Sequence, residues 1–181
     1  ETMEDIKGIA DLAMKIVHLF GQMPDKPKGK GVTVSVSCAT FVPKPFTPFE
    51  FEPQDTEEMI KAKQQYLLEC TGSKKIKLSW HDPATSILEA VLARGDRRLG
   101  KVIYKAWQSG CKFDSWGEYF DWSKWLAAFD ECDVSPDFYA HRRREYDEIN
   151  PWDHIDIGVT KNFFVRQDKL AHESITTPHC K

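Results

Sequence analysis

The sequence predicts an α/β fold: the remnant of a partial βα (TIM-like) barrel with few short parallel strands, followed by a mainly helical extension. Two short segments, 32–36 and 76–80, alternate apolar and polar residues as half-buried strands do. Helical patterns precede and separate these segments, which is the order that a βα barrel supplies. Beyond residue 80 the patterns are helical. We therefore divide the chain into a barrel part, 1–82, and a helical extension, 83–181.

The barrel part begins with an amphipathic helix over residues 2–21, which has acidic residues in its first turn. After the first strand, four prolines between residues 43 and 53 exclude a regular helix or a central strand, because each proline lacks a backbone donor and fixes φ. Asp55 then offers an N-cap for a helix to about residue 69.

The extension opens at Asp82-Pro83, which favours a helix start because proline is tolerated at the first helical position. Further helices are expected over 99–110, after a capping box at 115–118, from 135 toward 142, and from Thr160 to about 171. Four of the six tryptophans lie between residues 107 and 125, a density typical of a well-packed helical core.

Composition narrows the class of protein. The chain has 181 residues, of which 41% are hydrophobic and 29% charged, as in ordinary soluble domains. A net charge of −3 gives no support for a general nucleic-acid or membrane surface. No apolar run approaches a membrane span and no signal-peptide pattern opens the chain, so we expect no membrane partner and a cytoplasmic location. The five scattered cysteines are expected to be reduced thiols.

The chain carries four stretches that point to one family: FVPKPFTPF at 41–49, SWHDP at 79–83, LARGDRRLG at 92–100 and NPWDHIDIGV at 150–159. Together they resemble the C-terminal part of radical S-adenosylmethionine (radical SAM) proteins that also contain a cobalamin-binding domain. The family binds its cluster through a CxxxCxxC loop, and that spacing does not occur in this sequence. We therefore expect the chain to be a fragment of a longer enzyme, inactive alone, whose first partner is the missing N-terminal part of the same polypeptide.

The resemblance also implies cofactors. The full enzyme would use S-adenosylmethionine and a 4Fe-4S cluster for reductive cleavage to a 5′-deoxyadenosyl radical, or for cobalamin-linked methyl or thio transfer. No cofactor or metal is expected to be bound to this fragment. In a longer chain, Cys180 would open a cysteine cluster for a second iron–sulfur centre.

The resemblance further implies that the end of the first strand and the loop after it flank S-adenosylmethionine or the substrate. The loops at the carboxyl ends of barrel strands carry the chemistry in βα barrels. The residues concerned are Val36, Cys38, Phe41 and Pro43. The alternative is plain packing and turn geometry.

Two further groups are candidate site residues, and two other runs are expected to have structural roles. His81 beside Asp82 is a weak candidate for general acid/base catalysis, the alternative being that Asp82 caps the next helix. Arg94, Arg97 and Arg98 suit a phosphate, a carboxylate or an RNA backbone. The run 142–144 is expected to pair with the acids that follow it on a solvated face, and 153–156 to form a buried turn rather than a metal site.

Two predictions concern partners. The unpaired strand edges of a barrel remnant invite pairing with another chain, which predicts a homodimer or a swapped oligomer. As an alternative to the enzyme fragment, the Trp- and Arg-rich extension would be a binding module for RNA or a protein.

Overall fold

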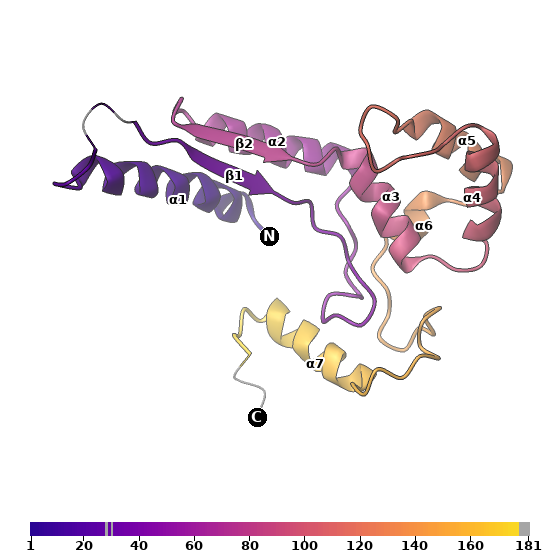
Figure 1. Ribbon diagram of the computed structural model, residues 1–181. Helices are drawn as coiled ribbons and strands as arrows, with labels where there is room; N and C mark the ends of the chain where they lie inside the picture. Colours follow the sequence, from indigo (N-terminus) through magenta and orange to yellow (C-terminus); the bar gives the residue numbers. More distant parts are fainter. Residues whose placement is uncertain (28, 30, 178–181) are drawn as a thin grey trace. The chain divides into compact units, whose positions relative to one another are not determined.

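The computed structural model describes residues 1–27, 29 and 31–177. The chain is mixed α/β and mostly helical, with two short parallel strands in the part that is described (Figure 1). Its internal contacts divide it into two compact units. The first comprises Glu1–Thr40 and Asp55–Pro83, and the second Phe41–Gln54 and Ala84–Lys181. The helices of the second unit thus begin next to the predicted boundary at residues 82 and 83. The loop 41–54, which the sequence analysis placed in the barrel part, belongs to the second unit instead. The division into a barrel part and a helical extension stays a prediction.

The first unit is built on a parallel two-stranded sheet. β1 (Val34–Cys38) pairs with β2 (Ile76–Trp80) in full register, with Val34 opposite Ile76 and Cys38 opposite Trp80. α2 (Glu57–Cys70) lies between them in sequence, as parallel strands need a crossover connection. Figure 1 shows the two strands side by side. The second strand is confirmed as predicted, and the first begins two residues later than expected.

Two helices pack on the same face of this sheet. α1 (Met3–Gln22) starts with a capping box in which Thr2 and Asp5 satisfy each other's backbone N–H groups. The buried residues of α1 form two apolar clusters with the strands and α2. They include Ala13 and Val17 with Val34, Val36, Ile76 and Leu78, and Ile6 and Ala10 with Leu67 and Cys38. The cap of α2 is Thr56, one residue after the predicted Asp55, which instead pairs with Lys63.

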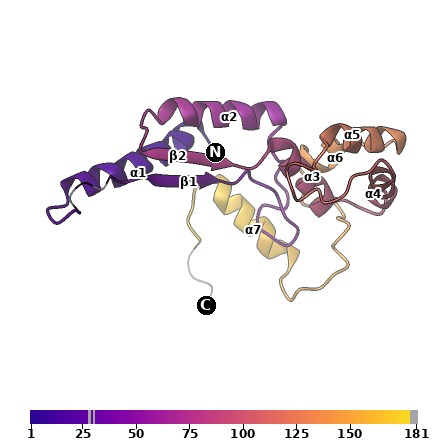
Figure 2. The ribbon, with the colours of Figure 1, turned by 45° about the horizontal axis from the view of Figure 1, so that its top comes forward.

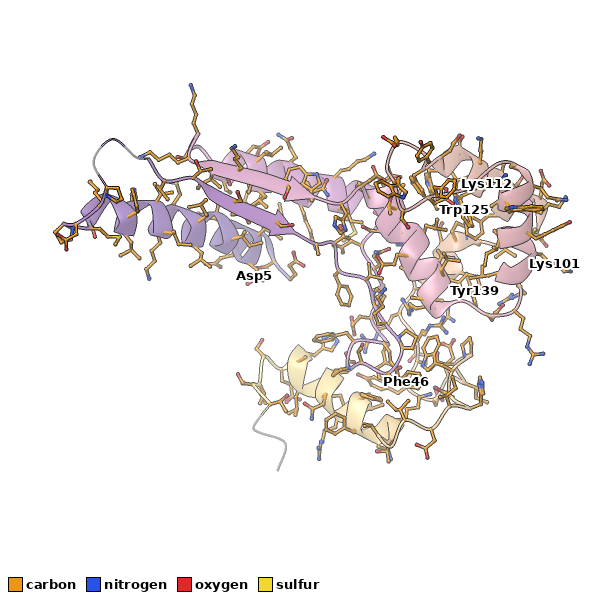
Figure 3. All side chains as sticks on the ribbon, viewed as in Figure 1. Asp5, Phe46, Lys101, Lys112, Trp125 and Tyr139 are labelled. Carbon is orange, nitrogen blue, oxygen red and sulfur yellow. The ribbon has the colours of Figure 1, made fainter. Side chains whose placement is uncertain are left out.

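The core of the second unit is formed by α3 (Pro83–Arg94), α4 (Leu99–Gln108), α5 (Trp122–Glu131) and α6 (Pro136–Ala140). Figure 2 shows these helices gathered around one another. Their buried side chains form one cluster, which includes Val91, Val102, Trp125, Phe129 and Tyr139. Trp125 and Tyr139 are labelled within this group in Figure 3. α7 (Lys161–His172) completes the unit and begins after Thr160, as predicted.

The junction of α3 and α4 requires a glycine. A Cβ atom at Gly95 would lie 1.9 Å from Leu99 Cδ1 and 2.9 Å from the carbonyl oxygen of Val91. No side chain fits against a backbone carbonyl at that distance, so the two helices can turn this closely only at Gly95.

The predicted start of α5 is wrong. The sequence Ser115–Glu118 has the pattern of a capping box, yet it lies in turns, and the helix begins six residues later than predicted, at Trp122. The carboxylate of Asp121 caps the helix instead, accepting from the backbone N–H groups of Ser123 and Lys124. Phe113, with φ of 59°, directs the chain into these turns.

The proline-rich segment 41–54 is a structural part of the second unit. Phe51 is fully buried and meets the ring of Tyr146 edge to face, with centroids 5.0 Å apart. Gln54, 2% exposed, donates from its backbone to the Ala140 carbonyl at 2.8 Å and from Nε2 to the Ser86 carbonyl at 3.1 Å. The segment therefore has a fixed conformation although it has no regular secondary structure.

Glu50 is the buried acid of this segment. Its Oε2 accepts from the Phe46 N–H at 2.8 Å and from Trp152 Nε1 at 3.0 Å. Burial raises the pKa of Glu50, and the nearby carboxylate of Asp153 adds to that rise. The folded protein therefore holds a proton on Glu50 at pH values where the unfolded chain has released it.

We expect Glu50→Gln to stabilise the protein at pH 7 by about 1 kcal/mol, because the amide oxygen can accept both hydrogen bonds without a buried charge. A raised folded pKa means that the wild type loses stability as the pH rises from the unfolded to the folded pKa. The advantage of the variant should consequently shrink below pH ~4.5, where Glu50 is protonated in both states. Thermal melts at pH 4 and pH 7 measure this, and an equal gain at both pH values would contradict it.

Candidate functional site

The two faces of the β1–β2 sheet differ in chemistry. Val36 and Cys38, predicted to flank a cofactor, lie on the face that α1 and α2 cover, and burial raises the pKa of the Cys38 thiol. The uncovered face carries exposed polar side chains: Ser35, Ser37, Lys77 and Ser79. Within the described part of the chain, no side-chain hydrogen bond or ion pair holds these four residues.

The register places these polar residues in two pairs. Ser35 lies opposite Lys77, and Ser37 lies opposite Ser79. Parallel sheets are ordinarily covered on both faces, so an open polar face is unusual for this kind of sheet. Sequence reasoning found the alternation and placed the candidate cofactor residues, Val36 and Cys38, on the face that the helices cover. A cofactor role for these residues stays a prediction. The small polar residues at the alternate positions are the signal for the open face.

Phe41 and Pro43, the other two residues predicted to flank a cofactor or the substrate, belong to the second unit. Pro43 is fully buried, so its side chain serves the core. Phe41 is 43% exposed and meets Phe49 edge to face, with centroids 6.1 Å apart. Neither is paired with a titratable group, and a cofactor role for them stays a prediction.

His81 and Asp82 lie between β2 and α3, directly before Pro83, and both side chains are exposed. Proline begins α3 as the sequence predicts. An acid/base role for this pair stays a prediction.

The three arginines predicted as a phosphate or RNA cluster have three different environments. Arg94 is fully buried and donates to the carbonyls of Glu52 at 3.0 Å and Ala140 at 3.3 Å, so it faces no solvent ligand. Arg98 binds the Asp96 carboxylate through Nε and Nη2. Arg97 is exposed, and its guanidinium has no partner among the described residues.

The run 142–144 was predicted to lie on a solvated face, which is wrong for Arg144. Arg144 is 3% exposed and donates to the Arg94 carbonyl at 3.0 Å and to Asn150 Oδ1 at 2.9 Å. The predicted pairing with the following acids is present at Glu148, which binds both Arg142 and Arg144. Hydrogen bonds from Arg142 hold the pKa of Glu148 below its usual range.

A compact charged cluster fastens α7 to the rest of its unit, and sequence reasoning missed it. Asp168 on α7 is fully buried. Its Oδ2 accepts from the Tyr146 hydroxyl at 2.6 Å and from Arg143 Nη2 at 3.0 Å. Glu52 pairs with Arg143 and lies 2.9 Å from His172 Nε2. These residues come from three separated segments, so no local pattern could reveal them.

The donor atoms of this cluster have the composition of a metal site. Glu52, Asp168 and His172 each offer one ligand atom, and the three atoms lie within 4.8 Å of one another. However, the Arg143 guanidinium contacts all three, including a 3.3 Å contact with His172 Nε2. The guanidinium takes the place that a metal ion would need, and it forms an ion pair with both carboxylates. We therefore interpret the cluster as an ionic fastening of α7.

Two predictions concern segments beyond these clusters. Within 153–156, predicted as a buried turn, the side chains are exposed, and the buried residue beside them is Trp152. Cys180 lies outside the described residues. Cys38, Cys70, Cys111 and Cys132 are free thiols.

None of the helices in the described part of the chain is both long and apolar enough to span a bilayer.

Comparison with known proteins gives one informative similarity. Over 103 residues, or 57% of this chain, the sequence is 30% identical to an uncharacterized protein of the archaeon Methanocaldococcus jannaschii. The chain spans about one fifth of the length of that protein. No family model and no solved structure matches the chain.

Proposed function

We propose that this chain is the C-terminal part of a radical SAM enzyme, in which β1 and β2 are neighbouring strands of a βα barrel. The 4Fe-4S cluster would be held by the N-terminal part of the same polypeptide. S-adenosylmethionine and the cluster, with or without cobalamin, would supply the radical chemistry or the methyl or thio transfer. This chain would supply one wall of the barrel.

One observation carries the proposal. The β1–α2–β2 unit is parallel, its helices lie on one face, and its other face bears small polar residues. Strands of a βα barrel have helices outside and alternate residues inside the barrel. In such a barrel Ser35, Ser37, Lys77 and Ser79 would face the interior, where a ligand could use their free donors. The match to one fifth of a longer archaeal protein agrees with a segment of a larger chain.

The test is 5′-deoxyadenosine formation by the longer polypeptide after anaerobic reconstitution with iron and sulfide. We expect the longer enzyme to form it and the 181-residue chain to form none. Lys77→Met in the longer enzyme should lower turnover about tenfold or more, because misplacing a bound substrate is costly in rate. Lys74→Met, which removes the same charge from the turn before β2, is the control and should leave the rate unchanged. Product formation by the 181-residue chain would refute the proposal.

A second function, recognition of a partner molecule by the helical extension, is favoured by exposed aromatic residues. Tyr104 and Trp107 on α4 stack with centroids 5.7 Å apart, and both are more than half exposed. Phe113, Trp116 and Tyr119 in the loop before α5 are also exposed. Of the three arginines that suggested RNA binding, only Arg97 is free of an ion pair or carbonyl partners in the described chain.

A further inference from the structure

An open hollow of about 780 Å³ lies in the second unit, between the start of α4 and the segment before α7. It is lined by residues 95–98 and by Ile149, Asn150, Pro151 and His154. All of these residues except Ile149 come from two of the four sequence stretches described above, 92–100 and 150–159, which are far apart in the chain. Arg144 holds the two stretches together, because it donates to the Arg94 carbonyl and to Asn150 Oδ1.

Asn150, one of the residues that line this hollow, has a buried hydrogen-bond donor. The residue is 3% exposed, and its Oδ1 accepts from Arg144 Nη1 at 2.9 Å. Because a guanidinium can only donate, this bond fixes which end of the amide is oxygen. The Nδ2 group then has no partner among the described residues. Leaving a buried donor unpaired costs folding free energy, which an acceptor on a ligand would recover.

The charges at the hollow favour an anion. Arg97 is exposed and has no counter-ion in the described chain. The only lining carboxylate in the described residues, Asp96, is bound by Arg98, which lowers the pKa of Asp96 to about 2. The neighbouring Asp153 is paired with Lys161 at 2.9 Å. The hollow therefore carries one positive charge that no acid neutralises.

We propose that this hollow binds the phosphate group of a small molecule, through the Arg97 guanidinium, Asn150 Nδ2 and the imidazole of His154. Three donors from separate positions suit the three free oxygens of a phosphate better than the two oxygens of a planar carboxylate. Ile149, 88% exposed at the rim, supplies an apolar contact for the remainder of the molecule. The proposal does not depend on the radical SAM assignment.

The experiment is calorimetric titration of the 181-residue chain with inorganic phosphate and phenyl phosphate, with acetate as the carboxylate probe. Arg97→Ala should weaken phosphate binding about tenfold or more, as expected for loss of a charge-assisted hydrogen bond. Asn150→Asp keeps an acceptor for Arg144 but replaces the free donor by an anion, so phosphate binding should be lost while the melting temperature does not fall.

Lys101→Ala is the matched control, because it removes one positive charge from α4 outside the hollow. Figure 3 shows Lys101 on the outer side of this helix group. The control should bind phosphate like the wild type. Absence of phosphate binding at millimolar concentration, equal loss in Lys101→Ala, or equal affinity for acetate would each overturn the proposal. Binding of an RNA oligonucleotide without binding of phenyl phosphate would overturn it too, and would favour the RNA-binding module.

Discussion

Arg94→Met is expected to lower the free energy of unfolding of the second unit by about 3–5 kcal/mol. The arginine guanidinium donates to the carbonyls of Glu52, Ala140 and Arg142, which join segment 41–54 to the chain after α6. Methionine keeps the apolar stem but removes the Arg94 donor from all three carbonyls, of which Ala140 keeps the Gln54 N–H. Because the acceptors are backbone atoms, no single substitution elsewhere can remove them in compensation.

The desolvation cost of the buried Arg94 guanidinium opposes the loss of stability in Arg94→Met. Burial, together with the positive charges of Arg144 and Arg142, lowers the pKa of Arg94 to about 10. Desolvating the guanidinium therefore costs free energy, and methionine removes that cost. We expect the loss of three hydrogen bonds at once to dominate, although the Ala140 carbonyl still accepts from the Gln54 N–H.

Urea denaturation followed by tryptophan fluorescence measures the effect, in a buffer without phosphate. Arg97→Met is the matched control, because Arg97 is exposed and unpaired in the described chain, and its effect should stay within about 0.5 kcal/mol. A loss below about 1 kcal/mol for Arg94→Met would show that the carbonyls find other donors.

Phe51→Ala should cost about 3–5 kcal/mol and release segment 41–54 from the second unit. The Phe51 ring is fully buried against Tyr146, and its backbone carbonyl accepts from the Arg144 N–H at 2.8 Å. Removal of the ring leaves a cavity beside the buried arginines and lets water reach them. Amide hydrogen exchange should then show loss of protection at Gln54 and Arg144 before the rest of the unit opens.

The control for this prediction is Phe113→Ala, the same substitution at a ring that is 72% exposed. Its effect should be within about 0.5 kcal/mol. Equal destabilisation by the two variants would mean that Phe51 contributes no more than a surface ring, and would contradict the structural role assigned to segment 41–54.

Sequence patterns predicted the helices and strands that are determined by residues close together in the chain. The alternation at 76–80 gave β2, and Asp82-Pro83 gave the start of α3, because strand faces and helix starts depend on neighbouring residues. The capping-box pattern at 115–118 failed because the same residue types also form turns, and a positive φ at Phe113 favours turns there. The sequence pattern alone does not show whether such residues begin a helix or form turns.

The buried charges could not be predicted in the same way. Arg94 and Arg144 have the composition of a solvated or ligand-binding cluster, yet both are in the core. Their partners are backbone carbonyls and the side chains of Asn150 and Glu148, which only the tertiary fold brings to them. Likewise, the face of the sheet that α1 and α2 cover depends on helix packing and not on the alternation itself.

The chain passes between its two units three times, at residues 40–41, 54–55 and 83–84. Segment 41–54 is synthesised early, but the groups that bury it, such as Ser86, Arg94, Ala140 and Tyr146, leave the ribosome much later. Until then Phe51 lacks the ring of Tyr146 and Gln54 lacks the carbonyls of Ser86 and Ala140, so the nascent segment exposes apolar surface that can aggregate or attract a chaperone. Stalling translation before residue 140 should therefore yield a chaperone-bound or insoluble nascent chain, even though every residue of the β1–α2–β2 unit has already been made.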